Sequence, residues 1–229
     1  MRDESLDLLI ELAAPAPGDV VLDYAVVPSL AAFAVAPIVR SLEAVAERAD
    51  MLEEGTRLAL ELGLDNVTFA LVDLFKLPYD PGAFSLAMSC EALHLSPNPL
   101  AALTELRRVV SANGRLVLVE PVVDDVLDEP FNRLARLRQS AHRRYFRPAE
   151  LDELVAKAGL RVSREGSVRR TVDLDYWMQV AGVPASRAAL ISDRFRALPV
   201  DVQMALDVAF SDTAISFSYD ARGLRLEQG

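Results

Sequence analysis

One stretch decides the fold of this chain: Val20-Val21-Leu22-Asp23-Tyr24-Ala25-Val26-Val27-Pro28-Ser29. It predicts a short buried strand over Val20–Asp23, then a turn, then a helix that begins near Pro28 or Ser29. In α/β proteins of the doubly wound kind, a strand-to-helix turn of this type is where a nucleotide-like cofactor is held. We therefore take this stretch as the candidate cofactor edge of the fold.

The turn contains no glycine, although glycine is the usual residue where the backbone takes positive φ and passes close to a ligand. The corresponding positions hold Ala25, Val27 and Ser29. Val27 is β-branched, and Pro28 favours an extended conformation for it and removes one backbone N–H from the helix start. Two interpretations stay open: an ordinary packed turn, or a remodelled turn that still leaves room for a cofactor.

Composition restricts the class of protein. The chain has 229 residues, is 52% hydrophobic and 25% charged, and carries a net charge of −10. This predicts one folded domain, with or without a helical appendage, and argues against nucleic-acid binding. The single Cys90 and two histidines give no disulfide framework and little basis for a metal site.

No membrane or export signal is recognisable in the sequence. The start of the chain reads as an amphipathic helix with acidic residues, not as a signal peptide. The longest uncharged run, residues 24–39, is shorter than the roughly 20 residues that a membrane-spanning helix needs. We expect a soluble, cytoplasmic protein with neither a membrane nor a nucleic acid as partner.

Hydrophobic periodicity predicts alternating helices and strands in the first half. Helices are expected over 5–12 (with Ser5 as N-cap), 29–36, 49–62 and 99–110, and strands over 20–23, 38–46, 67–72, 84–89 and 115–119, the last after an Asn113-Gly114 turn. This alternation predicts an α/β fold: a Rossmann-like, mostly parallel sheet with helices on both faces.

The character changes after Pro121. Helices are expected over 131–147, 148–158, 174–180 and 185–208, and strands over 160–163 and 214–219. We therefore predict a Rossmann-like core over residues 1–121. Residues 122–229 are predicted to form a helix-rich C-terminal lid or substrate region that also carries the last strands of the sheet.

Four stretches resemble a known family: Pro17–Asp23, Asn66–Ser89, Glu91–Pro121 and Ser140–Leu160. Their order and spacing are similar to class I S-adenosylmethionine-dependent methyltransferases, especially those of ubiquinone and menaquinone biosynthesis (methyltransferase type 11). The resemblance implies that fold, S-adenosylmethionine (SAM) as the methyl donor and a small-molecule methyl acceptor.

The resemblance also places the cofactor contacts. By position in the family pattern they fall on Asp23, Tyr24, Ala25, Val27, Ala46, Glu47, Asp73, Leu74 and Cys90. The family's glycine-rich motif falls on residues 25, 27 and 29, and its ribose-binding acid falls on Ala46, beside Glu47. Asp73 matches the family's adenine-binding Asp, although an Asp at a strand end is equally a helix cap. The adenine side is therefore kept, whereas the methionine and ribose contacts are lost.

Three further side chains are candidates for chemistry. His94 follows the fourth predicted strand and is either a general base or a non-catalytic neighbour of the site. His142 either orients a substrate from the lid or is a surface histidine, and its place in a basic predicted helix favours the surface position. Cys90 lacks an activating partner nearby in the sequence, which favours a packed thiol over a nucleophile.

The segment 131–170 is basic, although the whole chain is acidic. Its arginines either form a surface for an acidic substrate or partner, or pair with acids within the fold.

Two hypotheses on function follow from this. The first is a methyltransferase that retains SAM through Asp73, Leu74 and a remodelled first turn, and that methylates a small molecule. The second is a methyltransferase-fold protein with a degraded SAM-binding loop. Such a pseudoenzyme would act as a partner subunit or regulator, or would bind another ligand in the same cleft. A protein partner and a homodimer both remain open.

Overall fold

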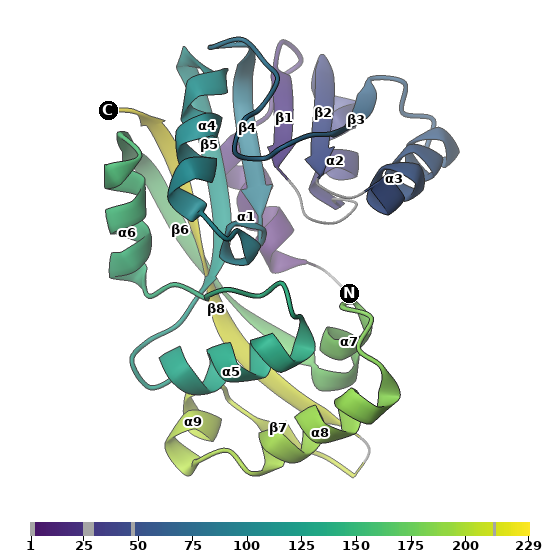
Figure 1. Ribbon diagram of the computed structural model, residues 1–229, viewed down its shortest axis with the longest axis vertical. Helices are drawn as coiled ribbons and strands as arrows, with labels where there is room; N and C mark the ends of the chain where they lie inside the picture. Colours follow the sequence, from purple (N-terminus) through teal and green to yellow (C-terminus); the bar gives the residue numbers. More distant parts are fainter. Residues whose placement is uncertain (1–2, 25–29, 47–48, 213) are drawn as a thin grey trace.

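The computed structural model of the chain describes residues 3–24, 30–46, 49–212 and 214–229, and it is built on a twisted sheet (Figure 1). The strand order is β3-β2-β1-β4-β5-β8-β6, and β7 pairs with β8. All neighbouring pairs from β3 to β5 are parallel, and β8 runs antiparallel between β5 and β6. The predicted Rossmann-like α/β fold with a mostly parallel sheet is therefore confirmed.

The elements follow the predicted alternation. The strands are β1 (Val20–Tyr24), β2 (Ser41–Ala46), β3 (Val67–Leu71), β4 (Phe84–Cys90), β5 (Val110–Val122), β6 (Leu160–Asp173), β7 (Ala209–Phe210) and β8 (Ile215–Gln228). The helices are α1 (Glu4–Ala13), α2 (Leu30–Val35), α3 (Ala49–Glu61), α4 (Pro99–Val109), α5 (Asp128–Arg138), α6 (Pro148–Lys157), α7 (Leu174–Gln179), α8 (Ala185–Arg196) and α9 (Val200–Ala205), with short 3₁₀ turns η1 (Ala36–Ile38) and η2 (Leu93–Leu95).

Both faces of the sheet are covered, because neighbouring strand residues point to opposite sides. On β1, Val21 packs into a cluster with α1 and α2, whereas Leu22 packs into a second cluster with α4 and α6. A strand buried on both faces reads as a continuous apolar run, as 20–22 does.

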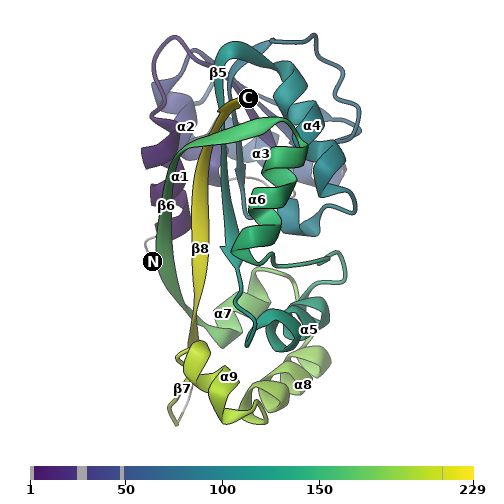
Figure 2. The same ribbon diagram turned by 90° about the vertical axis from the view of Figure 1, so that its left-hand side faces the viewer.

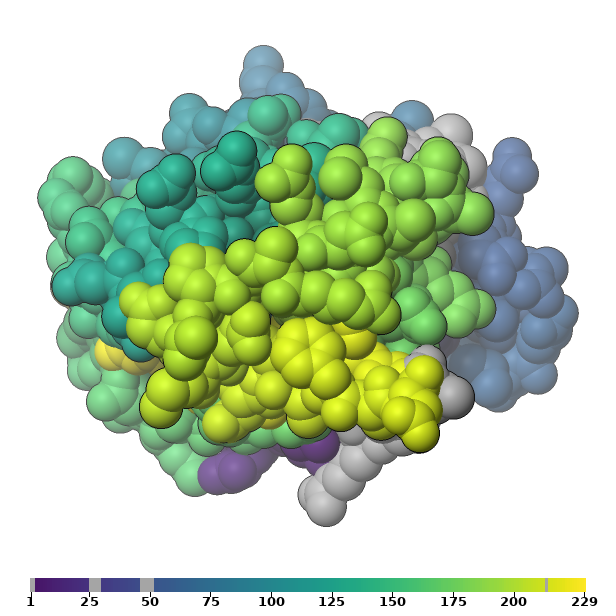
Figure 3. Space-filling view, turned by 90° about the horizontal axis from the view of Figure 1, so that it is seen from below, coloured from purple at the N-terminus to yellow at the C-terminus, as the bar shows by residue number. Residues whose placement is uncertain are grey.

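A third cluster forms the lid beneath the sheet, from α5, α7, α8, α9 and the adjoining ends of β6 and β8 (Figures 1 and 2). Its centre is aromatic: Phe131, Trp177, Phe195, Phe217 and Tyr219 are all buried. Figure 3 shows the lower surface of this lid, which α8, α9 and the end of β8 cover. The long strands β6 and β8 run from the sheet into the lid.

Two helix predictions in the lid were wrong. The expected helix 131–147 ends at Arg138, because the backbone N–H groups of Arg143 and Arg144 instead donate to the carbonyl of His94, at 3.1 and 3.2 Å. The expected helix 185–208 is two helices. Pro199 caps α9, and a proline disfavours helical conformation in the residue before it.

Several boundaries also differ from prediction. Asp3, not Ser5, caps α1 by accepting the Leu6 N–H at 3.1 Å. β2 begins at Ser41, because η1 includes Ile38 and the chain bends at residues 39 and 40 before the strand starts. Residues 113–114 lie inside an irregular β5, and β6 and β8 are far longer than predicted. The start of β6 was predicted over 160–163, but its continuation to Asp173 was missed because it is a polar edge strand whose charges face solvent.

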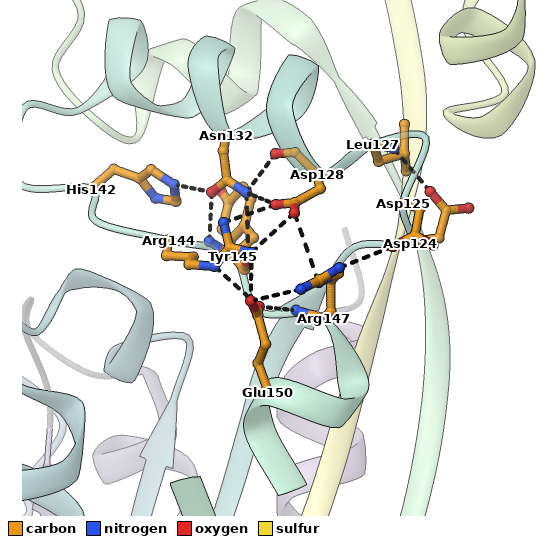
Figure 4. Close-up of polar contacts among 10 residues, drawn as sticks. All are labelled: Asp124, Asp125, Leu127, Asp128, Asn132, His142, Arg144, Tyr145, Arg147 and Glu150. Carbon is orange, nitrogen blue, oxygen red and sulfur yellow. Dashed lines mark hydrogen bonds and ion pairs between the residues drawn. The ribbon is translucent and has the colours of Figure 1, made fainter. Parts of the chain in front are cut away.

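The lid is attached to the following segment by a buried amide (Figure 4). Asn132 Oδ1 accepts the Tyr145 N–H at 2.6 Å and lies 2.8 Å from His142 Nε2. Asn132 Nδ2 donates to the carbonyl oxygens of Asp128 and Tyr145. Because these donations fix the amide orientation, His142 Nε2 must carry the hydrogen.

Gly114 sits where β5 is irregular, and a side chain has no room there. A Cβ at this position would lie 2.7 Å from Val110 Cγ1 and 2.8 Å from the Ser85 carbonyl oxygen. We expect Gly114→Ala to lower the free energy of unfolding by about 1–3 kcal/mol, because backbone must shift to relieve the contact. Urea denaturation measures it. Gly18→Ala is the control, since nothing lies within 4 Å of a Cβ there; equal effects of the two variants would contradict this packing.

His142 should make stability depend on pH. Burial, together with the neighbouring His94 ring and the positive charges of Arg136 and Arg138, lowers its pKa to about 3. An unfolded histidine titrates near 6.5, so between these values the unfolded state binds more protons and the free energy of unfolding falls as the pH decreases. The contribution is at most about 1.4 kcal/mol per pH unit.

His142→Gln keeps a donor toward Asn132 and removes the titration. Urea denaturation of both proteins at pH 7.5 and 5 measures the effect. The native protein should lose more stability than the variant over this interval, and an equal loss would show that His142 is not the titrating group.

Candidate functional site

The carboxyl ends of the parallel strands bring the predicted cofactor residues to one edge. Asp23 on β1 pairs with Ala44 on β2 and Met88 on β4, so the strands end together. Of the predicted contacts, Asp23, Tyr24, Ala46 and Cys90 end these strands. Ala25, Val27 and Glu47 lie outside the described residues.

Asp23 and Tyr24 form the floor of this edge. Asp23 is completely buried. Tyr24 is 1% exposed and packs in the cluster with Val45 and Leu74. The tyrosine ring is therefore part of the hydrophobic core directly beneath this edge.

Asp73 lies beyond β3 and is exposed. Its Oδ1 accepts the Phe75 N–H at 2.8 Å and so closes a local turn, but no helix follows, and the helix-cap interpretation was wrong. Its other oxygen makes no hydrogen bond to the residues that the structure describes, which leaves an acceptor for a ligand. Leu74 is buried in the core beside Leu77.

Glu43, the other acid near the end of β2, is engaged by a neighbour. The Tyr79 hydroxyl donates to Glu43 Oε1 at 2.6 Å. Burial and this carboxylate raise the pKa of Tyr79, so the hydroxyl remains a donor.

The region around Cys90 is negative. Burial raises the pKa of the Cys90 thiol well above its usual value, so it is protonated at neutral pH. The carboxylates that raise this pKa further are those of Glu91, Asp3, Glu120 and Asp23. The electrostatics support the packed-thiol interpretation and disfavour a nucleophile.

One of these acids is tied to the N-terminal helix. Glu91 follows β4 with a φ of 51°, and Ser5 Oγ donates to its Oε1 at 2.7 Å. Arg170 on β6 binds the same oxygen and also contacts Asp3 and the Tyr219 hydroxyl. The first turn of α1 is thereby fixed beside the carboxyl edge.

His94 lies on η2 and is held by Glu120, a fully buried carboxylate on β5. Glu120 accepts the backbone N–H groups of Ala92, Leu93 and His94 at 3.0, 2.7 and 3.2 Å. His94 Nδ1 lies 2.9 Å from Glu120 Oε2. Sequence reasoning missed Glu120; its one signal was an acid directly after an apolar strand.

His142 is not the surface histidine that sequence favoured. It is 3% exposed, and its ring centroid lies 4.4 Å from that of Tyr145 and 5.5 Å from that of His94. With its Nε2 hydrogen donated to Asn132, it contributes to packing between the lid and the sheet.

Most of the basic segment is paired within the fold. Arg144, Arg147, Lys157, Arg161, Arg164, Arg169 and Arg170 each form an ion pair with an acidic side chain. Many of these pairs join the segment to acids elsewhere in the chain, as Arg161 does with Glu227 and Arg164 with Glu11. Internal pairing thus accounts for much of its positive charge.

Two negative findings concern the described part of the chain. It contains no group of three or more His, Cys, Asp or Glu side chains placed to hold a metal ion. None of its helices combines the length and apolar character needed to cross a membrane.

Comparison with known proteins gives the family. Residues 38–159, more than half of the chain, match a family model described as a methyltransferase domain. The uncharacterized methyltransferase YcgJ of Bacillus subtilis is 29% identical over 186 residues, which cover 80% of this chain and 74% of that protein. Its crystal structure matches with a TM-score of 0.87 at 25% identity, over 99% of both chains.

Two more distant structures share the fold. Geranyl diphosphate C-methyltransferase of Streptomyces coelicolor, solved with Mg²⁺, geranyl diphosphate and S-adenosyl-L-homocysteine, has a TM-score of 0.67 at 17% identity. It covers 99% of this chain and 78% of its own. The [4+2]-cyclase SpnF has a TM-score of 0.73 at 19% identity, over 98% and 80% of the chains. With the sheet order and the family match together, this chain belongs to the class I S-adenosylmethionine-dependent methyltransferases.

Proposed function

We propose that the protein transfers a methyl group from SAM to a small-molecule acceptor at the carboxyl edge of the sheet. One observation carries the proposal: the chain belongs to a methyltransferase family by the match over residues 38–159, and the ends of β1, β2 and β4 bring the family's cofactor positions Asp23, Ala46 and Cys90 to one edge. In α/β folds of this kind, ligands bind at the carboxyl ends of the strands.

The other residues at the edge fit only part of the methyl donor SAM. Asp73 offers its free carboxylate oxygen to the adenine amino group. Ala46 ends β2 without an acceptor for the ribose hydroxyls, so that contact is weaker than in the family pattern. When bound, SAM supplies an electrophilic methyl group. The protein's task is then to align the acceptor with it, and alignment alone lowers the barrier substantially.

A second candidate function rests on the sequence of the first turn. Ala25, Val27 and Ser29 replace the family's glycines, and a lost charged hydrogen bond at Ala46 costs about 1.5–3 kcal/mol. If both losses abolish SAM binding, the chain is a pseudoenzyme that serves as a partner subunit or binds another ligand. A fold shared with a [4+2]-cyclase does not decide between the two.

Calorimetric titration with SAM and S-adenosylhomocysteine separates these functions. The proposed enzyme should bind both with micromolar dissociation constants at neutral pH. Absence of binding at millimolar ligand would overturn the proposal and favour the second candidate.

Asp73→Asn should weaken SAM binding about tenfold, because it keeps the acceptor for the Phe75 N–H but loses the charge, a change of roughly 1.5 kcal/mol. Asp65→Asn is the matched control, with the same charge change before the start of β3. Equal dissociation constants for the two variants, measured by calorimetry, would remove Asp73 from the site.

A further inference from the structure

The protonation of His94 is fixed by its partner. Glu120 receives hydrogen bonds from three backbone N–H groups, which by nature only donate. Because its oxygens already accept these N–H groups, Glu120 is the acceptor in the 2.9 Å contact as well, and His94 Nδ1 supplies the hydrogen. In a neutral imidazole the other nitrogen then holds a lone pair.

Within the described residues, no donor forms a hydrogen bond with that lone pair. His94 Nε2 makes no hydrogen bond to any residue that the structure describes, although the side chain is only 5% exposed. The neighbouring rings are those of Tyr145 and His142, at 5.0 and 5.5 Å between centroids. His142 is neutral and its Nε2 hydrogen is committed to Asn132, so it does not compete for the lone pair.

The imidazole is also held rigidly in place. The His94 carbonyl accepts the backbone N–H groups of Arg143 and Arg144, and its own N–H binds Glu120. A base that is fixed on both sides keeps its geometry during the reaction, and the adjacent carboxylate stabilises the imidazolium that forms when it takes a proton.

We propose that His94 is the general base of the reaction and that the acceptor is a neutral hydroxyl compound. This rests on the proposed methyl transfer. The acceptor oxygen bonds to the methyl carbon while the carbon–sulfur bond of the donor breaks, and that electron pair stays on sulfur. The hydroxyl proton passes to His94 Nε2, so the products are a methyl ether, S-adenosylhomocysteine and an imidazolium paired with Glu120.

The protonation state can be tested without turnover. In ¹⁵N NMR spectra of the histidine-labelled protein at neutral pH, His94 should show a protonated Nδ1 and an unprotonated Nε2. A hydrogen on Nε2 would overturn the proposal. This measurement does not depend on whether SAM binds.

The catalytic role is tested with two probes and one variant. Phenol, with a pKa of about 10 like that of a tyrosine side chain, needs a base, whereas 4-nitrophenol is largely ionised at neutral pH. His94→Asn retains an amide donor toward Glu120 but has no basic nitrogen. Its methyl transfer to phenol should fall by about 100-fold or more, and its transfer to 4-nitrophenol by much less.

His142→Gln is the control for a purely structural effect, and should change both rates by the same factor. Equal loss on both probes in His94→Asn, full activity of that variant, or no methylation of either probe by native protein that binds SAM would each overturn the base and its substrate class. Failure of the native protein to bind SAM in the calorimetric titration would instead remove the proposed function itself.

Discussion

One buried carboxylate joins the segment after β4 to the segment between α5 and α6. Glu120 on β5 accepts the consecutive backbone N–H groups of residues 92–94 and a hydrogen from His94 Nδ1. The carbonyl of His94 in turn accepts the N–H groups of Arg143 and Arg144, which lead into α6. A carboxyl group buried to this extent is tolerated because its oxygens take part in these four hydrogen bonds. The segment after β4, η2 and the segment after α5 are therefore placed by a single side chain.

The sequence predicted most strands of the sheet, but it predicted the helices and long strands of the lid much less well. Strands such as 84–89 are apolar on both faces and flanked by turn residues, which is a strong local signal. β6 gave little signal because its side chains are mostly polar and exposed, and because its partners on β8 lie about 43 to 68 positions away in the sequence. The helix predicted over 131–147 failed for the same reason: a carbonyl distant in sequence provides the hydrogen bonds that would otherwise extend it.

The same distinction between local and long-range signals applies to the residues of the candidate site. Residues assigned by their place at strand ends, such as Asp23 and Cys90, do lie at the carboxyl edge, because parallel strands place their ends together. Side chains whose role depends on a long-range partner were not assignable: Glu120 was missed, and His142 was interpreted as a surface residue. The family pattern concerned residues that touch the cofactor, whereas these two acquire their roles from contacts within this fold.

The long strands β6 and β8 have a consequence for motion. They are hydrogen-bonded to each other over nearly their whole length, from Leu160 paired with Gln228 to Asp173 paired with Ser216, and so they belong to the sheet at one end and the lid at the other. Because this ladder joins the two parts, the lid cannot swing as an independent body without breaking it. Any movement of the lid against the sheet would therefore bend the paired strands or rearrange the shorter segments around them.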